Sequence, residues 1–500
     1  MVILKQFVFL SLLVACARAV VISISTSELS GLEYFFNSTN GTEWDWRNGN
    51  GSAPHWEFNP VTTDPCGSNP WQGLNCSCPS TDNCTVVSIL LADYNLTGTV
   101  PSEVSLLPNL LNFDVSGNNV AGSDLSYICG LPMLKSLQMN GCGLSGSLPS
   151  CLVNLSFLEI LRLSMNMLSG SIPEDIGLLS NLEVLNLESI LVCSPENSKR
   201  IPDLAAFGNS SCSSVTNVID LVADYDIAMS GTLPTSLCQL GSLGSFDMAF
   251  QRISGSIPSC IGSISSLTGL AFPGNMLHGS IPSQIGQLTS LLLLYLDTNR
   301  LSSTIPPTIG QLDRLRTLTM NLNVINGSLP SNLCNLSNLQ GLALGSNNFS
   351  GSIPSCVGQL GVLTVLDLVK SNITGTIPEG IMNMSALQKL YLDLNDLNGT
   401  IPTSIAKLAN LTTIGLNRNK LTGSIPAELP LSLQHIWLQA NSLTGVVPAR
   451  IGCMTQLYEI VLDDNFLSHS LPDSLGSLTT CVYLNVSFNK LSGMYEFVYA

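Results

Sequence analysis

The fold is decided by the stretch Leu387-Gln-Lys-Leu390-Tyr-Leu392-Asp-Leu-Asn395-Asp-Leu397-Asn-Gly399-Thr-Ile401-Pro402. Its Leu-x-x-Leu-x-Leu segment alternates apolar and other residues, which predicts a short strand with every second side chain buried. Asn395 follows where the chain turns away from the strand, and Gly399 and Pro402 mark the return path. One such coil cannot bury its apolar face alone, so the stretch predicts a stack of similar coils.

The same pattern recurs along most of the chain. Between Val86 and Ala500 we count about seventeen units of about 24 residues, the last one incomplete. Stacked units share a continuous core, so the sequence predicts an α/β solenoid with a parallel β-sheet on its concave face. The repeated Gly-Ser/Thr-apolar-Pro motif begins at Gly146, Gly170, Gly255, Gly279, Gly327, Gly351, Gly375 and Gly399.

Most units carry an Asn at the turn after the strand. An amide that points inward there can bond the backbone of adjacent coils, as a buried polar group requires. In one unit Cys142 occupies this slot, where we expect a small buried residue. The asparagines in this slot are Asn166, Asn275, Asn299, Asn323, Asn347, Asn395, Asn419, Asn441, Asn465 and Asn489.

The composition excludes several classes of protein. Only 10% of the residues are charged, against about 25% in ordinary soluble domains, and the mean hydropathy is +0.35. The net charge of −16 leaves no basic patch that could neutralise phosphates, so we expect no nucleic-acid partner. An apolar content of 45% excludes a disordered chain.

The start of the chain is typical of a secretory signal. Lys5 is the only charge before the apolar stretch 7–16, and Ala17-Arg18-Ala19 has the small-x-small pattern of a cleavage site. We expect residues 1–19 to be removed, with an uncleaved anchor as the alternative. No later apolar run reaches about 18 residues, so the sequence predicts no membrane span and a secreted or cell-surface location.

The repeat resembles the plant-type class of leucine-rich repeats, whose pattern is L-x-x-L-x-L-x-x-N-x-L-x-G-x-I-P. The resemblance covers 86–500 and implies a right-handed superhelix. Residues 20–85 contain a segment similar to the family's disulfide-bonded N-terminal cap. The residues that carry this second resemblance are Leu32, Phe35, Phe36, Asn40, Gly41, Trp44, Trp46, Trp56, Cys66 and Trp71-Gln-Gly-Leu-Asn-Cys76.

Two features depart from the regular repeat. The unit that begins at Leu182 runs 36 residues to Val218, so we expect an irregular insertion at 190–217. Family members often carry a loop on the ligand side, and the insertion is either such a contact or a tolerated bulge joined by Cys193 and Cys212. No closing cap, transmembrane segment or kinase domain precedes Ala500, so we expect a truncated gene product or an end covered by another subunit.

The cysteine spacing predicts disulfides, because a secreted chain meets an oxidising compartment. Three pairs share a spacing of 22 residues, which brings neighbouring coils together on the outer face. In the cap we expect two further bridges, although sequence leaves their connectivity open. A zinc site is a weaker interpretation of the cap cysteines, since no His lies nearby. The predicted pairs are Cys129–Cys151, Cys238–Cys260, Cys334–Cys356, Cys66–Cys76 and Cys78–Cys84.

Asn-x-Ser/Thr sequons are abundant, and glycans on them would supply the hydrophilicity that charge does not. Several occupy the same slot of different repeats on the outer face, for example Asn154, Asn335 and Asn383. The candidate glycosylation sites are Asn37, Asn83, Asn95, Asn154, Asn335, Asn348, Asn372, Asn383, Asn410 and Asn485.

Side chains between the inward leucines are expected to face the concave surface and form a candidate ligand-binding stripe. Aromatic rings provide area for stacking, and carboxylates and amides give direction, as in peptide or sugar recognition. The alternative is that they are ordinary exposed strand residues. His435 is expected to be such an exposed residue. The stripe consists of Asp247, Tyr295, Asp297, Thr319, Asn321, Asp367, Tyr391, Asp393, Trp437, Gln439 and Asp463.

The sequence favours a non-catalytic recognition protein that binds a peptide, glycan or protein on its concave face, with a possible co-receptor. The four His residues have no Ser, Cys or acidic partner at a meaningful spacing, so we expect no enzyme, no cofactor and no metal site. Two alternatives stay open: a truncated ectodomain of a membrane receptor-like protein or receptor kinase, and a secreted inhibitor of cell-wall-degrading enzymes similar to polygalacturonase inhibitors.

Overall fold

The computed structural model describes residues 23–46, 55–58, 64–80, 83–122, 125–189 and 228–492. The predicted signal 1–19, the insertion at 190–217 and its pair Cys193–Cys212 lie outside these ranges. The chain divides into two compact units, and each is described by itself. The first runs to Val192 and includes 227–229, and the second contains the repeats from Ser230 onward.

The first unit opens with helix α2 (Thr26–Ser38) and a short 3₁₀ helix, η1 (Gly41–Glu43). Ser25 caps α2, and Glu28 completes a capping box by accepting the backbone N–H of Ser25. Leu32 and Phe35 on the same helix face are fully buried. They help to form the apolar core that fixes the helix against the first strands.

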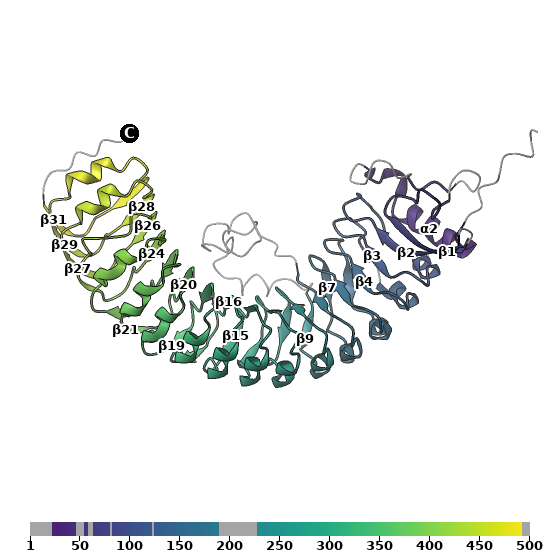
Figure 1. Ribbon diagram of the computed structural model, residues 1–500, viewed down its shortest axis with the longest axis horizontal. Coiled ribbons are helices and arrows are strands. Elements are labelled where there is room, and N and C mark those ends of the chain that lie inside the picture. Colours follow the sequence, from purple (N-terminus) through teal and green to yellow (C-terminus); the bar gives the residue numbers. More distant parts are fainter. Residues whose placement is uncertain are drawn as a thin grey trace, which may run out of the picture. The chain divides into compact units, whose positions relative to one another are not determined.

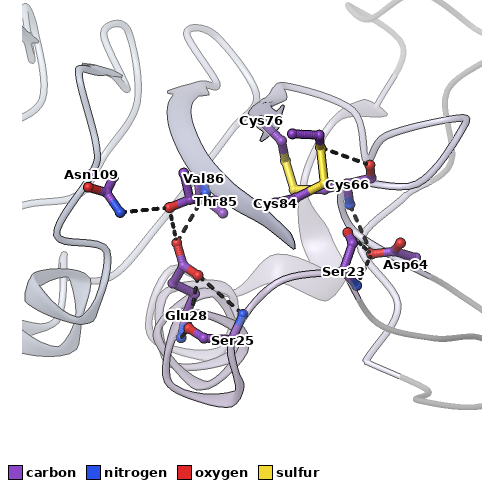
Figure 2. The surroundings of a disulfide bond; sticks show 11 residues. Ser23, Ser25, Glu28, Asp64, Cys66, Cys76, Cys84, Thr85, Val86 and Asn109 are labelled. Atoms are coloured by element: carbon purple, nitrogen blue, oxygen red, sulfur yellow. Dashed lines mark hydrogen bonds between the residues drawn. A yellow bond between two sulfur atoms is a disulfide. The ribbon is translucent and has the colours of Figure 1, made fainter. Parts of the chain in front are cut away.

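A buried carboxylate ties helix α2 to the sheet (Figure 2). Glu28 is 5% exposed, and its Oε1 accepts from the Thr85 hydroxyl at 2.5 Å and from the Val86 backbone N–H at 3.1 Å. The structure contains both predicted cap pairs, Cys66–Cys76 and Cys78–Cys84, and Figure 2 shows Cys66, Cys76 and Cys84 beside this contact.

The sheet of the first unit begins with an antiparallel pair and continues in parallel. Strand β1 (Leu74–Ser80) pairs with β2 (Asn83–Leu90), and the next four strands follow at one per coil. These are β3 (Asn112–Asp114), β4 (Ser136–Gln138), β6 (Ile160–Arg162) and β8 (Val184–Asn186).

The second unit contains a parallel sheet with one short strand per coil. In six of these eleven strands the central residue is buried and both neighbours are at least partly exposed, as the alternating pattern predicts, and in three strands all three residues are buried. The strands are β10 (Ser245–Asp247), β12 (Gly269–Ala271), β14 (Leu293–Tyr295), β16 (Thr317–Thr319), β18 (Gly341–Ala343), β20 (Val365–Asp367), β22 (Lys389–Tyr391), β24 (Thr413–Gly415), β26 (His435–Trp437), β28 (Glu459–Val461) and β30 (Tyr483–Asn485).

Within each unit, the return path of most described coils contains a second short strand and a 3₁₀ helix. Figure 1 shows that in the second unit the helices lie on the outer side and the main sheet on the inner, concave side. The second strands are β5 (Ser145–Ser147), β7 (Met167–Ser169), β9 (Ser230–Thr232), β11 (Arg252–Ser254), β13 (His278–Ser280), β15 (Arg300–Ser302), β17 (Asn326–Gly327), β19 (Asn348–Phe349), β21 (Thr374–Thr376), β23 (Asp396–Asn398), β25 (Thr422–Ser424), β27 (Ser442–Gly445), β29 (Phe466–His469) and β31 (Lys490–Leu491).

The 3₁₀ helices mostly start directly after the Pro of the repeat motif, whose fixed φ suits an extended approach to the turn. They are η3 (Ser102–Leu106), η4 (Leu125–Gly130), η5 (Ser150–Asn154) and η6 (Ile176–Leu178) in the first unit. In the second unit they are η9 (Thr235–Gln239), η10 (Ser259–Ser263), η11 (Ser283–Gln287), η12 (Pro307–Gln311), η13 (Ser331–Asn335), η14 (Ser355–Gln359), η15 (Glu379–Asn383), η16 (Thr403–Lys407), η17 (Ala449–Cys453) and η18 (Asp473–Ser477).

The predicted asparagine ladder is present in both units. In a typical case, Asn395 donates to the Leu368 carbonyl of the preceding coil at 2.7 Å and accepts from the Ile373 N–H at 3.0 Å. Asn118 makes the same contacts, although it was not among the asparagines assigned to this slot from the sequence. Cys142 replaces the amide and is buried, as expected, with its Sγ donating to the Val115 carbonyl.

The disulfides with 22-residue spacing join consecutive 3₁₀ helices. The structure contains Cys129–Cys151 between η4 and η5, Cys238–Cys260 between η9 and η10, and Cys334–Cys356 between η13 and η14. Each bridge therefore connects one coil to the next on the side opposite the main sheet. Stacked parallel strands, a shared leucine core and these bridges confirm the solenoid predicted from the period.

Candidate functional site

The middle stripe residues occupy one row on the concave face of the second unit. The parallel register aligns Asp247, Ala271, Tyr295 and Thr319 on successive strands. The same row continues through Ala343, Asp367, Tyr391, Gly415 and Trp437. The structure thus brings together the predicted residues of this row, while the predicted Asp297, Asn321, Asp393, Gln439 and Asp463 follow two positions later in their coils.

Asp297 has both carboxylate oxygens occupied by protein donors. The Thr319 hydroxyl donates to its Oδ2, and the Asn321 backbone N–H donates to its Oδ1 at 3.0 Å. Burial raises the pKa of Asp297 to about 6 against the opposing effect of these hydrogen bonds. Thr319 is only 5% exposed, so it supports Asp297 and differs from the open stripe residue expected from sequence.

Asp393 occupies the equivalent slot four coils later and is also buried, with 5% of its surface exposed. Its Oδ1 accepts from the Asn417 backbone N–H at 3.0 Å and from the Asn417 side-chain amide. Burial raises the pKa of Asp393 to about 7, because these donors only partly offset the loss of water. Sequence alternation could not reveal this depth.

Four aromatic side chains form a continuous strip that begins at Tyr391, on the same coil as Asp393. The rings of Tyr391 and Trp437 stack at 6.2 Å between centroids with an interplanar angle of 19°. His435 lies 5.7 Å from Trp437 and 5.7 Å from Tyr458, and its Nδ1 is 3.5 Å from a Glu459 oxygen. His435 is therefore a half-buried member of the strip, which differs from the exposed residue expected.

Tyr458 was missed because it occupies the slot after the first leucine of its coil, which is not one of the slots that make up the predicted stripe. The signal that could have found it is the adjacent coil, which places the aromatic His435 on the neighbouring strand. Sequence spacing alone did not indicate that the two rings meet.

Two further acidic residues of the stripe, Asp247 and Asp367, lie in the row that contains Tyr391 and Trp437. Asp367 accepts from the Val369 N–H at 2.9 Å, and burial raises its pKa to about 6. Asp247 accepts from the Ala249 N–H at 2.9 Å, and burial also raises its pKa. Among the described residues, the ion pairs of the second unit are Lys420–Asp396, His435–Glu459 and Arg450–Glu428, so these carboxylates have no basic partner.

The far end of the stripe contains two buried oxygens without hydrogen-bond partners. These are Oε1 of Gln439 and Oδ1 of Asp463, which lie in the same slot of consecutive coils. In contrast, the Asn321 side-chain oxygen accepts from the Gly345 N–H. The buried acceptors without a partner therefore lie in the coils of β26 and β28.

The sequon asparagines are placed where glycans can be attached. The ten candidate asparagines are exposed except Asn485, which is half-buried on β30 of the concave sheet. Asn154, Asn335 and Asn383 end the 3₁₀ helices η5, η13 and η15, which is the shared outer slot that the sequence indicates. Their glycosylation stays a prediction.

Over the described ranges, no three His, Cys, Asp or Glu side chains gather closely enough to hold a metal ion. A search of the same residues finds no helix with the length and apolar character needed to cross a membrane.

The coil geometry, the asparagine ladder and the capped first unit define a plant-type leucine-rich repeat protein. Two leucine-rich repeat family models match the chain, one over 361–421 and the other over 133–155 and 157–179.

Among named proteins, a probable leucine-rich repeat receptor-like serine/threonine-protein kinase of Arabidopsis thaliana is 46% identical over 50 residues, or 10% of this chain and 6% of its own length. The chain therefore matches only a small part of that relative. A TDR receptor structure aligns with a TM-score of 0.70 and 27% identity, covering 80% of this chain and 63% of the receptor.

The plant peptide hormone receptor RGFR1 in complex with RGF2 aligns with a TM-score of 0.67 and 28% identity, covering 84% of this chain and 72% of that receptor. The similarity to both receptors extends over most of the repeats and defines the architecture.

Proposed function

We propose that this chain is a non-catalytic ligand-binding ectodomain, displayed outside the cell, that holds an extended peptide along the concave face of its second unit. The observation that carries the proposal is the aromatic strip of Tyr391, Trp437, His435 and Tyr458. It lies on the same concave sheet as the carboxylates Asp367 and Asp393. Partly exposed rings next to directional acceptors are typical of recognition surfaces. The likeness to a plant peptide hormone receptor supports a peptide as the ligand.

The length of the row sets the length of peptide that it can hold. Asp247 and Trp437 are separated by eight strand-to-strand steps. At about 4.8 Å per step the row spans about 38 Å, which an extended peptide of about 12 residues would cover at about 3.3 Å per residue.

Trp437 provides a built-in probe of this site. The chain has five tryptophans, and Trp437 is the one that lies outside the cap segment 44–71. The full glycosylated chain is immobilised and exposed to a pool of random synthetic 12-residue peptides. The retained peptides are identified by mass spectrometry and titrated while Trp437 fluorescence is recorded.

The double variant Tyr391→Ala/Trp437→Ala is expected to weaken a retained peptide at least about tenfold, or ~1.4 kcal/mol. Binding of the double variant is measured by calorimetry, because its reporter is removed. Tyr34→Ala changes an exposed ring on α2 and serves as the matched control. Unchanged affinity in the double variant, or no retained peptide at all, would reject the concave site.

A further inference from the structure

Two copies of one Tyr–Asp pair lie in the second unit and differ at two neighbouring positions. Tyr295 with Asp297 and Tyr391 with Asp393 occupy equivalent slots four coils apart. The next strand places Thr319 beside Tyr295 in the first copy. In the second copy it places Gly415 beside Tyr391. The internal repeat thus provides its own comparison between two otherwise similar sites.

This difference changes how the two carboxylates are bonded. In the first copy, Thr319 donates to Oδ2 of Asp297 and closes that oxygen off. In the second copy both protein hydrogen bonds to Asp393 reach Oδ1, from the backbone and side chain of Asn417. Oδ2 of Asp393 has no donor among the described residues, and it points into the space that a side chain on residue 415 would fill.

The open oxygen lies next to a flat aromatic surface. Tyr391 and Trp437 come from strands on either side of β24, and their rings stack across Gly415. In the first copy, the residue equivalent to Trp437 is Ala343, so that site has no such stack. A stacked pair of rings beside a carboxylate suits a planar cation, which a guanidinium provides.

The local charge is unbalanced in the same place. Asp393 is nearly buried, and the charge of Asp367 acts on it. Neither carboxylate belongs to any ion pair of the part of the chain that the structure describes. A paired cation stabilises the charged form of a buried carboxylate, and a ligand can supply the cation that the described residues do not.

We propose that the space over Gly415 is a subsite for one arginine side chain of the bound peptide. The guanidinium lies against the Tyr391–Trp437 stack and donates to Oδ2 of Asp393. Arginine fits better than lysine, because it is planar and donates at several fixed positions. This inference rests on the proposed function and adds the chemical specificity of the site.

The test uses two synthetic capped 12-residue peptides that differ at one central residue, either arginine or citrulline. Citrulline has nearly the same shape and lacks the charge. Binding to the full glycosylated chain is measured by calorimetry and by Trp437 fluorescence. We expect the arginine peptide to bind at least about tenfold more tightly.

Variants then assign the preference to the proposed atoms. Gly415→Thr introduces the hydroxyl that closes Asp297 in the first copy, and Asp393→Asn removes the charge while keeping an acceptor for Asn417. Both are expected to reduce the ratio of the two affinities to about one. Thr319→Gly removes the hydroxyl that donates to Asp297 in the first copy. Asp396→Asn changes an exposed carboxylate that lies on the same coil as Asp393 and pairs with Lys420. Both controls are expected to keep the preference.

The outcomes separate the inference from the proposed function. Equal affinities of the two peptides, lost together in Tyr391→Ala/Trp437→Ala, would overturn the arginine subsite and leave the peptide-binding face intact. A preference that survives Gly415→Thr and Asp393→Asn would also overturn it. The absence of saturable binding of either peptide up to about 10 mM would reject both. Displacement of the arginine peptide by oligosaccharides would instead point to a glycan ligand.

Discussion

Replacing Asn395 with alanine tests how the coils are held together. Asn395 donates to the carbonyls of Leu368 and Leu392 and accepts from the N–H groups of Ser371 and Ile373. The side chain is 8% exposed, so water does not easily replace it. Alanine is compatible with the backbone conformation of the turn, and it removes every one of these hydrogen bonds.

The expected loss of stability follows from the buried polar groups that are left without hydrogen-bond partners. Each buried donor or acceptor that loses its partner costs about 1–3 kcal/mol. The two N–H groups of Ser371 and Ile373 and the Leu368 carbonyl are affected, while partial relaxation of the turn recovers some of the loss. We therefore expect the free energy of unfolding to fall by about 3 kcal/mol.

The assay combines urea unfolding, followed by circular dichroism, with hydrogen exchange of the intact chain. The Ser371 and Ile373 amides are expected to exchange about 100-fold faster, which corresponds to the same free energy. Asn398→Ala, on exposed strand β23 of the same coil, is the control and should change neither quantity. The amide exchange rates of Ser371 and Ile373 and the unfolding midpoint could both equal those of the unaltered chain. In that case the asparagine ladder does not stabilise the contact between coils.

Three further predictions concern stability. The raised pKa values of Asp297, Asp367 and Asp393 favour the folded state while these groups are protonated, below about pH 4. This contribution is lost as pH rises through about 6–7, so the free energy of unfolding should fall across that window and fall less in Asp393→Asn, as measured by urea unfolding at several pH values. Removing the Cys238–Cys260 bridge with two serines should lower the free energy of unfolding by about 3 kcal/mol, and an equal midpoint in both chains under oxidising conditions would contradict this. Glu28→Gln should destabilise the cap by about 1–3 kcal/mol, seen as an earlier transition in cap tryptophan fluorescence, while Glu33→Gln on the exposed side of α2 should not.

Features that depend on the repeat period could be predicted from sequence. The asparagine slot and the 22-residue cysteine spacing each specify a contact between equivalent points of adjacent coils, and a period alone determines which residues meet there. Asn395 and the Cys334–Cys356 pair are examples, and the structure has both contacts.

Features that depend on how side chains lean across coils could not be predicted. The alternation of the strand placed Asp393 on the concave side, but its burial depends on contacts with Asn417 and on the absent side chain at Gly415. The stack of Tyr391 and Trp437 likewise joins strands two coils apart, because both rings lean over Gly415. Such contacts involve residues of three coils, so no sequence pattern within a single repeat predicts them.

A solenoid of nearly equal coils makes departures from the repeat informative about function. Thr319 and Gly415 occupy the same slot with the same acidic neighbour, and both glycine and threonine are compatible with the sheet there. Stability favours threonine, because strands disfavour glycine and the hydroxyl satisfies a buried carboxylate. The coil with Gly415 forgoes both contributions at the point where the aromatic strip begins. Local stability is thus lower where an open acceptor faces the concave surface, as expected of a binding position whose partner arrives from outside the chain.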